Sequence, residues 1–288
     1  MKSLGPVLTV LAVIVVLWYA AAVWLNAPWI EDQAQRAGEA APTLSQLIPL
    51  TMDQDRPVLP TPHQVLRELA GSTFGMAVTS KKSLIYHGWI TISATLLGFA
   101  MGTGFGILLA VGILHNRAMD LSVMPWAIAS QTIPILAIAP MIIVVMNSLG
   151  VQGLVPKAII SACLSFFPVL VGMVKGLRSP DQMQLDLLAT YGAGPRDVLV
   201  KLRLPASMPY LFASLKVGIA ASLVGAIVGE LPTGAVKGLG ARLLSGSYYG
   251  QTVQIWAALF AAALVAAGLV ALVSAVERRT LRRMGMAR

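Results

Sequence analysis

Six long apolar blocks dominate this sequence and restrict the folds that it can adopt. They lie near residues 6–28, 86–113, 121–147, 154–175, 208–230 and 252–275. About 20 apolar residues in a helix are enough to cross the hydrocarbon core of a bilayer. Only helices and closed barrels satisfy their backbone groups in lipid, and barrel strands would alternate polar and apolar residues. The uninterrupted blocks therefore predict an all-α integral membrane protein with about six transmembrane helices.

The scarcity of charge supports this class. Only 11% of the 288 residues are charged, whereas soluble domains carry about a quarter. The formal net charge is +9, which would suit nucleic-acid binding. The basic residues, however, cluster between or after the apolar blocks, which favours a role in membrane topology. The single cysteine, Cys163, has no partner for a disulfide and no companion at metal-ligand spacing, so no metal site is predicted.

The positions of Lys and Arg predict the orientation of the chain. With an even number of helices, basic residues at the start, in two connections and in the tail all fall on one side of the membrane. They are Lys2, Arg117, Lys175, Arg178, Arg196, Lys201, Arg203, Arg278, Arg279, Arg282, Arg283 and Arg288. The positive-inside rule makes that side the cytoplasm. The apolar run from Val7 to Leu25 exceeds the roughly 7–15 residues of a signal-peptide core, so we expect a retained anchor.

Four consecutive segments describe the predicted organisation. They are an anchor helix (1–28), a polar loop on the far side of the membrane (29–85), a five-helix core with a cytoplasmic loop at 178–207 (86–276) and a basic cytoplasmic tail (277–288). Several prolines predict an irregular loop over residues 40–62. Residues 63–72 predict a short amphipathic helix against the membrane. In the second apolar block, Gly98, Gly102 and Gly106 recur every fourth residue, a spacing that predicts close helix packing.

Four residues in or at the ends of apolar blocks are candidates for lining a solute path. Pro134, with Pro140, interrupts the third block, and such breaks free backbone groups and bend a helix. Gln131 and Thr132 beside the break could hydrogen-bond a solute, or they could bridge helices. Glu230, at the end of the fifth block, could face a water-filled path or reach the membrane surface.

Residues 181–210, DQMQLDLLATYGAGPRDVLVKLRLPASMPY, carry the most specific signal. They predict one short helix over 182–191, a break at the glycines of 192–194, and a second helix from Pro195. Proline suits that first turn because its missing N–H costs nothing there. We expect Leu204-Pro205 to end the second helix, because proline disfavours the helical conformation in the residue before it.

The first of these two helices has an apolar side. Leu185, Leu188 and Ala189 lie on it at helical spacing. An apolar face on a short loop has little to pack against within its own chain. It therefore predicts a contact with the groove of a partner protein.

This segment resembles the cytoplasmic loop signature of binding-protein-dependent ABC importer permeases. That signature reads roughly Glu-Ala-Ala, three residues, Gly, nine residues, Ile, one residue, Leu-Pro. Gly192 takes the glycine place, Leu202 the isoleucine place, and Leu204 and Pro205 the Leu-Pro place. The spacing from the glycine to the proline is intact.

The remaining signature positions depart from the family pattern. Asp186 replaces the glutamate, and Leu187 and Leu188 replace the two alanines that precede Ala189. Asp186 keeps the acidic charge on a shorter side chain, but two leucines stand in place of two small alanines. The fine shape of the docking surface therefore differs from the family pattern. Asp186 could cap the loop helix, pair with an arginine of an ATPase, or stay solvated.

Further elements extend the resemblance over most of the chain, to the nitrate, sulfonate and taurine branch of the family. They are Leu59-Pro60-Thr61-Pro62 with Val65-Leu66, Ile133-Pro134, Ala139-Pro140, Leu149-Gly150-Val151, Gly229-Glu230 and Gly238-Leu239-Gly240. Residues 29–58 look like an added periplasmic loop. The resemblance implies the type I ABC importer permease arrangement in a bacterial inner membrane.

The resemblance also implies partners. Two permease copies, as a homodimer, would surround a central path, two cytoplasmic ABC ATPase subunits would bind the 186–205 loops, and a periplasmic binding protein would deliver the solute. The sequence holds no Gly-Lys-Ser/Thr phosphate loop, so ATP and Mg would be bound by the ATPase and this chain would hold no cofactor and catalyse no reaction. The branch suggests sulfonates, taurine or nitrate, whereas residues 230–244 look closer to permeases for heterocycles such as thiamine-precursor pyrimidines or flavins.

Two other classes of membrane protein are open to test. An ATPase-independent channel or secondary transporter needs ionisable residues within the helices, and Lys216 and Glu230, both near helix ends, are the main candidates. A membrane-embedded enzyme needs clustered His, Asp, Glu or Cys at bilayer depth, and the sequence shows no such cluster.

Overall fold

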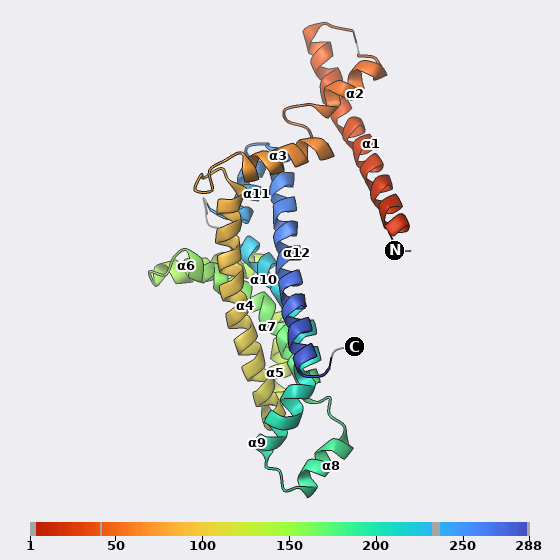
Figure 1. Cartoon of the computed structure of the whole chain (residues 1–288). Helices are drawn as coiled ribbons and strands as arrows, with labels where there is room; N and C mark the ends of the chain where they lie inside the picture. The colour runs from red at the N-terminus through yellow and green to blue at the C-terminus, as the bar shows by residue number, and fades with distance from the viewer. Residues whose placement is uncertain (1–3, 41, 232–236, 287–288) are drawn as a thin grey trace. The chain divides into compact units, whose positions relative to one another are not determined.

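The computed structural model describes residues 4–40, 42–231 and 237–286, and over these residues the chain forms helices and no strand (Figure 1). The elements are α1 (Leu4–Ala37), α2 (Leu44–Met52), α3 (Pro62–Phe74), α4 (Leu84–His115), α5 (Arg117–Ser130), α6 (Ile135–Ser148), α7 (Leu154–Leu177), α8 (Gln182–Thr190), α9 (Pro195–Asp197), η1 (Val198–Arg203), α10 (Leu204–Gly229), α11 (Leu239–Tyr248) and α12 (Thr252–Arg283). The predicted all-α class is confirmed.

The number of spans also agrees with the sequence. Within the described ranges, five helices are long and apolar enough to cross a membrane: α1, α4, α7, the continuous stretch 195–229 and α12. The pair α5 and α6 gives a sixth if it is counted as one broken span. The predicted count of about six helices is therefore confirmed.

The chain divides into two compact units. The first contains the residues up to His87 together with Ala241–Ala262, and the second contains Gly88–Gly240 together with Ala263–Arg288. The first unit holds the polar segment, 29–85, that the sequence places between the first and second spans. The second unit holds the loop that carries α8.

In the first unit, one buried asparagine organises the connection between α2 and α3. Asn26 of α1 is fully buried. Its Oδ1 accepts hydrogen bonds from the backbone N–H groups of Val58 (2.8 Å) and Leu59 (3.2 Å), and its Nδ2 donates to the Leu59 carbonyl (3.0 Å). A polar side chain inside an apolar helix thereby supplies partners for buried backbone groups.

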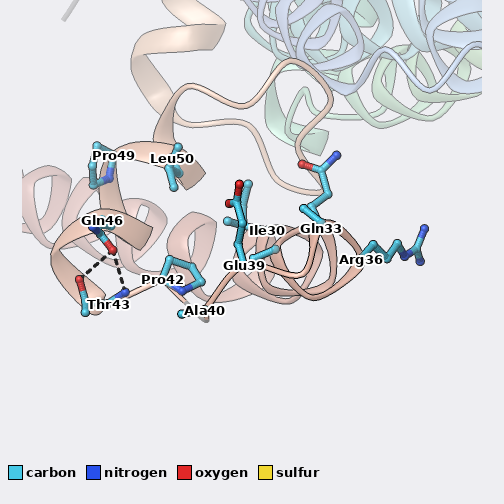
Figure 2. Close-up of a pocket in the computed structure, with 12 residues that line it drawn as sticks. Ile30, Gln33, Arg36, Glu39, Ala40, Pro42, Thr43, Gln46, Pro49 and Leu50 are labelled. Carbon is cyan, nitrogen blue, oxygen red and sulfur yellow. Dashed lines mark hydrogen bonds between the residues drawn. The ribbon is translucent and has the colours of Figure 1, made fainter.

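The prediction of an irregular loop over 40–62 is wrong in part, because α2 forms within it. Thr43 precedes α2, and its backbone N–H and hydroxyl both donate to Oε1 of Gln46 (3.2 and 3.1 Å). These contacts hold the first turn of α2, and Pro49 lies further along the helix. A groove of about 1190 Å³ lies between the end of α1 and α2 (Figure 2). The predicted helix at 63–72 is confirmed as α3.

In the second unit, glycines bring α4, α7 and α10 into close contact, as the spacing of Gly98, Gly102 and Gly106 predicts. A methyl group on Gly98 would overlap the side chain of Ser161 in α7, and one on Gly106 would come within 2.8 Å of the Phe166 carbonyl oxygen. Such close approach lets small residues stabilise helix pairs in lipid. The first unit has a comparable aromatic contact, in which Trp18 packs on Trp256 with ring centroids 5.0 Å apart.

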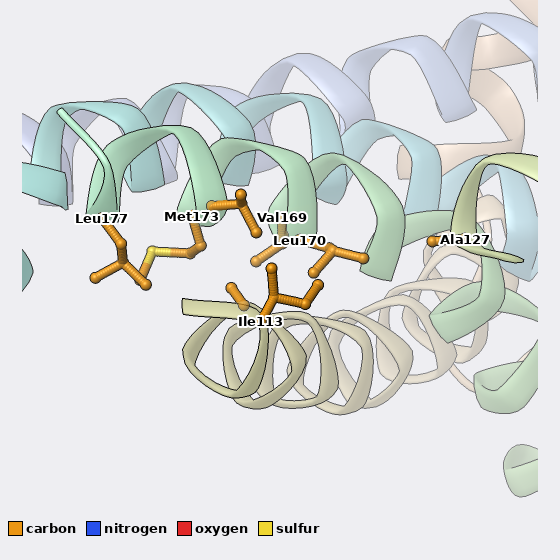
Figure 3. Close-up of a cluster of buried hydrophobic side chains, with 8 residues drawn as sticks. Ile113, Ala127, Val169, Leu170, Met173 and Leu177 are labelled. Atoms are coloured by element: carbon orange, nitrogen blue, oxygen red, sulfur yellow. The ribbon is translucent and has the colours of Figure 1, made fainter. Parts of the chain in front are cut away.

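Hydroxyl groups bond across the same three helices. Ser222 in α10 donates to the Thr95 carbonyl of α4 (2.8 Å), and Ser161 in α7 donates to the Ser222 carbonyl (2.7 Å). All three side chains are fully buried. Towards the end that carries α8, a cluster of buried apolar side chains continues this packing. It contains Ile113 of α4, Ala127 of α5 and Val169, Leu170, Met173 and Leu177 of α7 (Figure 3).

The third apolar block breaks sharply instead of bending. Helices α5 and α6 meet at 99° across residues 131–134, and α6 lies across the direction of α4 (Figure 1). Pro134 is the N-cap of α6, because proline favours a helix start and disfavours helix in the residue before it. Pro140 lies inside α6 and marks no break.

The prediction that Leu204-Pro205 ends a helix is wrong. Helix α9, the π-helical turn η1 and α10 follow one another without a gap from Pro195 to Gly229. In η1 the Leu204 N–H donates to the Leu199 carbonyl, five residues back. A π turn is wider than an α turn. It therefore moves the preceding carbonyls away from the Pro205 ring, and the helix continues.

Candidate functional site

Helix α8 lies in the connection between α7 and α9, within the second unit (Figure 1). None of its residues is buried. Asp181 is the N-cap, and its backbone N–H donates to the Gln184 side chain (3.3 Å). Local hydrogen bonds therefore hold α8 as a helix without help from a core.

The end of α8 is fixed by Gly192. This glycine has a φ of +72°, a conformation that is strained for any residue with a side chain. Its N–H donates to the Ala189 carbonyl (2.9 Å), and the Ala193 N–H donates to the Leu188 carbonyl (3.0 Å). These two bonds form the Schellman motif that commonly ends a helix. The turn predicted at residues 192–194 is confirmed, and it sets the direction in which α8 leaves the loop.

The exposed apolar face of α8 differs from the predicted one. Met183, Leu187 and Tyr191 are 80%, 57% and 80% exposed, and their spacing of four residues places them on one side. Leu185 and Leu188 are half-buried, and Ala189 is exposed. The sequence pattern missed Met183 and Tyr191 because they lie at the first turn and the C-cap.

The acidic residue of the signature does not cap α8, since Asp181 occupies the cap position. Asp186 lies on the surface, where its Oδ1 accepts a hydrogen bond from Nε2 of Gln182 one turn earlier (2.8 Å). The other signature residues, Leu202, Leu204 and Pro205, are half-buried in η1 and the start of α10. The structure thus places the signature partly on the exposed helix and partly at its root.

Polar contacts fasten the root of this loop to the bundle. Arg203 donates through Nη1 to the Leu177 carbonyl at the end of α7 (2.7 Å). Arg178 pairs with Asp120 of α5 at 2.9 Å. These contacts satisfy a helix-end carbonyl and connect the root of the loop to α5 and α7.

Replacing Gly192 with alanine is expected to destabilise the α8 loop by about 1 kcal/mol, because alanine is strained at positive φ. Hydrogen exchange of the amides at 188–193 should accelerate roughly fivefold. Gly194→Ala is the matched control, since Gly194 has a φ of −71° and open space around it. Equal exchange in both variants would contradict the assignment.

The candidate path residues at the α5–α6 break are all exposed. Gln131 donates to the Ser130 hydroxyl (3.3 Å) and Thr132 donates to the Ala129 carbonyl (2.7 Å). Both bonds stay within the end of α5, so within the described chain neither residue bridges two helices. Pro134 is exposed beside them. The break therefore presents polar groups on the surface of this chain.

Glu230 is fully buried and does not reach the surface. Its carboxylate accepts hydrogen bonds from the Thr91 hydroxyl of α4 (3.0 Å to each oxygen) and from the Gly240 N–H (2.8 Å). Nζ of Lys157 in α7 lies 3.8 Å away. A buried carboxylate is tolerated only when it is paired and hydrogen-bonded in this way.

Residues 238–240 lie against this carboxylate, and we call the arrangement the Glu230 knot (Glu230, Thr91, Lys157 and residues 238–240). The Leu239 N–H donates to the Thr91 hydroxyl (2.9 Å). A side chain on Gly238 or Gly240 would overlap Glu230. The Glu230 side chain fills the space beside both positions, which explains why each is a glycine.

Lys216 and Glu277 form an ion pair between α10 and α12 at 2.9 Å. Their side chains are 34% and 18% exposed. A Lys216→Met substitution should lower the free energy of unfolding by roughly 2 kcal/mol, because Glu277 would lose its counter-charge. The exchange of both charges should restore most of the thermal stability, and Lys201→Met, at an exposed pair with Asp197, should cost about 0.5 kcal/mol or less. A stable Lys216→Met protein would show that the pair contributes little.

Comparison with known proteins agrees with this arrangement. Residues 102–286 match the model of the family described as "Binding-protein-dependent transport system inner membrane component". A probable ABC transporter permease protein of Haemophilus influenzae is 30% identical over 202 residues, which are 70% of this chain and 77% of the relative.

Two further relatives carry more specific names. A riboflavin transport system permease protein of Chloroflexus aurantiacus is 31% identical over 78% of this chain and 80% of its own length. A formylaminopyrimidine transport permease protein of Halalkalibacterium halodurans is 29% identical over 64% of this chain and 68% of its own length. The match to the family model covers more than half of the sequence. This chain is therefore a multi-pass membrane protein that belongs to the binding-protein-dependent inner-membrane permeases of ABC importers.

Proposed function

We propose that this permease forms the translocation path of an ATP-driven importer and that α8 receives the ATPase subunit that drives it. The observation that carries the proposal is the exposed apolar stripe of Met183, Leu187 and Tyr191 on a helix without buried residues. Exposed apolar side chains on a short, locally stabilised helix suit insertion into a groove of a partner.

Charge supports placing α8 in the cytoplasm. Arg178, Arg196, Lys201 and Arg203 lie within or beside its loop. The arginines at the end of α12 would share that side in a chain with six spans, and the N-terminus with them. The contacts of Arg203 and Arg178 with α7 and α5 would then carry a push on α8 into the bundle. We infer that two ATPase subunits, which bind ATP and Mg, supply this push.

The break between α5 and α6 supports a path built from more than one chain. Its exposed backbone and the polar side chains of Gln131 and Thr132 are costly against lipid, and irregular backbone at membrane depth occurs where it meets protein or lines a water-filled cavity. A second copy of this permease, facing the first across the path, would supply that environment. Glu230 would support this path by holding neighbouring residues in place, because its carboxylate is enclosed in the Glu230 knot.

The proposed solute is a nitrogen heterocycle delivered by a periplasmic binding protein. The relatives named for riboflavin and formylaminopyrimidine transport are 31% and 29% identical, whereas a putative aliphatic sulfonates permease protein of Bacillus subtilis is 25% identical. The test is thermal stabilisation of the cognate binding protein by riboflavin, formylaminopyrimidine, taurine, an alkanesulfonate and nitrate. A shift with taurine, the alkanesulfonate or nitrate alone would overturn the heterocycle proposal.

The importer itself is tested by co-purification and reconstitution. The tagged permease should retain an ABC ATPase in mild detergent, and proteoliposomes holding both should accumulate solute only with ATP and the binding protein. Uphill uptake by the permease alone would identify the alternative, an ATPase-independent transporter. The charged groups at Lys216 and Glu230 do not favour that alternative, because both are engaged in ion pairs.

A further inference from the structure

Four arginines lie near the end of α12, just beyond its apolar run. They are Arg278, Arg279, Arg282 and Arg283, and all four are exposed. We call them the arginine face. The apolar block before them, residues 252–275, is about 36 Å long as a helix, and the hydrocarbon core of a bilayer is about 30 Å thick. The arginine face therefore follows the core at the depth of the lipid headgroups.

The neighbouring residue Glu277 shows which way the arginine face points. Its carboxylate accepts a hydrogen bond from Nζ of Lys216 in α10 (2.9 Å), so this side of α12 is turned toward α10. Successive residues of an α-helix are about 100° apart around its axis, which places the centre of the four arginines about 170° from Glu277. The arginine face is therefore directed away from α10.

Exposed apolar residues extend this side of α12 along the span. Leu264 and Leu272 are 63% and 59% exposed, and each lies within about 50° of the centre of the arginine face. Ala271 and Ala275 are exposed on the same side. An apolar surface on a membrane span suits contact with acyl chains. The headgroups of the same lipids would then lie against the arginines.

The charge of the arginine face is not neutralised within the chain. None of its four guanidinium groups forms an ion pair with any residue of the ranges that the structure describes, and the adjacent carboxylate of Glu277 is paired with Lys216. Four positive charges within two turns of helix create a strong local potential. Basic clusters that directly follow a membrane span attract anionic lipids.

Local hydrogen bonds hold the arginines in place. The Met286 N–H donates to the Leu281 carbonyl (2.9 Å), and the Gly285 N–H donates to the Arg282 carbonyl (3.2 Å). Gly285 has a φ of +71°, so these bonds form a Schellman motif that ends α12 after the last arginine. The backbone that carries the arginine face is therefore already helical, which lowers the entropy cost of binding a ligand there.

We propose that the arginine face of α12 binds the phosphate group of an anionic phospholipid such as phosphatidylglycerol. Guanidinium groups hold phosphate oxygens through paired N–H donors, and Arg278 and Arg282 are about 6 Å apart along the helix. An acidic protein surface would suit the charges but not the exposed leucines on the same side. The proposal does not depend on the proposed function, since it needs only a bilayer around α12.

The first experiment measures lipid retention by native mass spectrometry of the whole permease in detergent, titrated with phosphatidylglycerol or phosphatidylcholine. Wild-type protein should bind phosphatidylglycerol about tenfold more tightly, and each arginine removed should weaken that binding about fivefold. The double variant Arg282→Gln with Arg283→Gln should thus lose roughly twentyfold. Arg56→Gln with Arg117→Gln removes two exposed arginines elsewhere and is the matched control. Equal binding of the two lipids by wild type, or equal losses in both double variants, would overturn the proposal.

A second pair of substitutions guards against a general effect on insertion or folding. Arg282→Lys with Arg283→Lys keeps both positive charges, and phosphatidylglycerol binding should stay within about threefold of wild type. All variants should melt at the wild-type temperature, because the arginine side chains are exposed. A loss in the lysine pair as large as in the glutamine pair would show that charge is not the cause, which would also overturn the proposal.

Two further measurements distinguish the lipid from other anions. Excess inorganic phosphate should not displace phosphatidylglycerol, because it offers no acyl chains to the leucines, and displacement would identify a free-phosphate site instead. The glutamine pair should retain as much ABC ATPase as wild type. Loss of the ATPase with unchanged lipid binding would assign the arginine face to a protein partner. The lipid titrations decide the proposal even where no ATPase co-purifies with wild type.

Discussion

A Gly238→Ala variant is expected to lose most of its folded, membrane-inserted protein. Gly238 has a φ of +121°, and a methyl group there would overlap the carboxylate carbon and both oxygens of Glu230. The carboxylate would have to leave Thr91 and the Gly240 N–H, and Lys157 would lose its partner. The combined loss exceeds about 4 kcal/mol, since it adds overpacking to the breaking of a buried ion pair.

The measurement is the yield and melting temperature of the detergent-purified permease. Gly150→Ala is the matched control, because Gly150 also has a positive φ (+78°) but no atom within 4 Å of the added methyl group. That control carries only the backbone strain, about 1 kcal/mol. If both variants melt together, the Glu230 knot contributes little to the stability of the fold.

A Leu187→Asp variant is expected to reduce ATP-driven uptake by a hundredfold or more without unfolding the permease. Leu187 is the central residue of the exposed stripe on α8, and 57% of it is exposed. An aspartate there would carry a charge into a desolvated contact with the ATPase, which costs several kcal/mol. The fold should be unaffected, because no residue of α8 is buried.

Co-purified ATPase, uptake in proteoliposomes and melting temperature together check this result. Leu187→Met keeps an apolar side chain and should retain most of the uptake. Val58→Asp adds the same charge at a residue that is 61% exposed in the first unit, and it should leave the ATPase bound. Normal uptake by Leu187→Asp would remove α8 as the coupling surface.

The apolar blocks predict the spans because membrane helices are specified by composition over about 20 residues. The spacing of Gly98, Gly102 and Gly106 predicts close packing for a similar reason, since close approach needs only small side chains on one helix face. Short helices outside the spans are not predicted by composition in this way. Helix α2 begins within a proline-rich stretch, and α11 follows a glycine-rich one. Residues distant in the sequence contact the chain beside both helices, since Asn26 bonds to the segment after α2 and Thr91 accepts from the Leu239 N–H at the start of α11.

The candidate site shows the same division. Gly192 and the helix before it could be predicted, because a Schellman motif is local in sequence. The Glu230 knot could not, since it joins Thr91, Lys157 and Gly240, which are far apart in the chain. A local rule failed at Leu204-Pro205, where proline usually ends a helix. Here the π turn η1 accommodates Pro205 within a continuous helix.

That π turn also sets the rotational orientation of the helix that leads from α8 into α10. One residue more or less in an α-helix turns everything beyond it by about 100°. If all six residues of Val198–Arg203 took regular α geometry, the Met183, Leu187 and Tyr191 stripe would therefore turn around the axis of α10 while the rest of α10 stayed in place, whereas the wider π turn takes up the extra residue. The wide turn thus sets the direction in which the exposed residues of α8 face, and with it the side from which the proposed partner would bind.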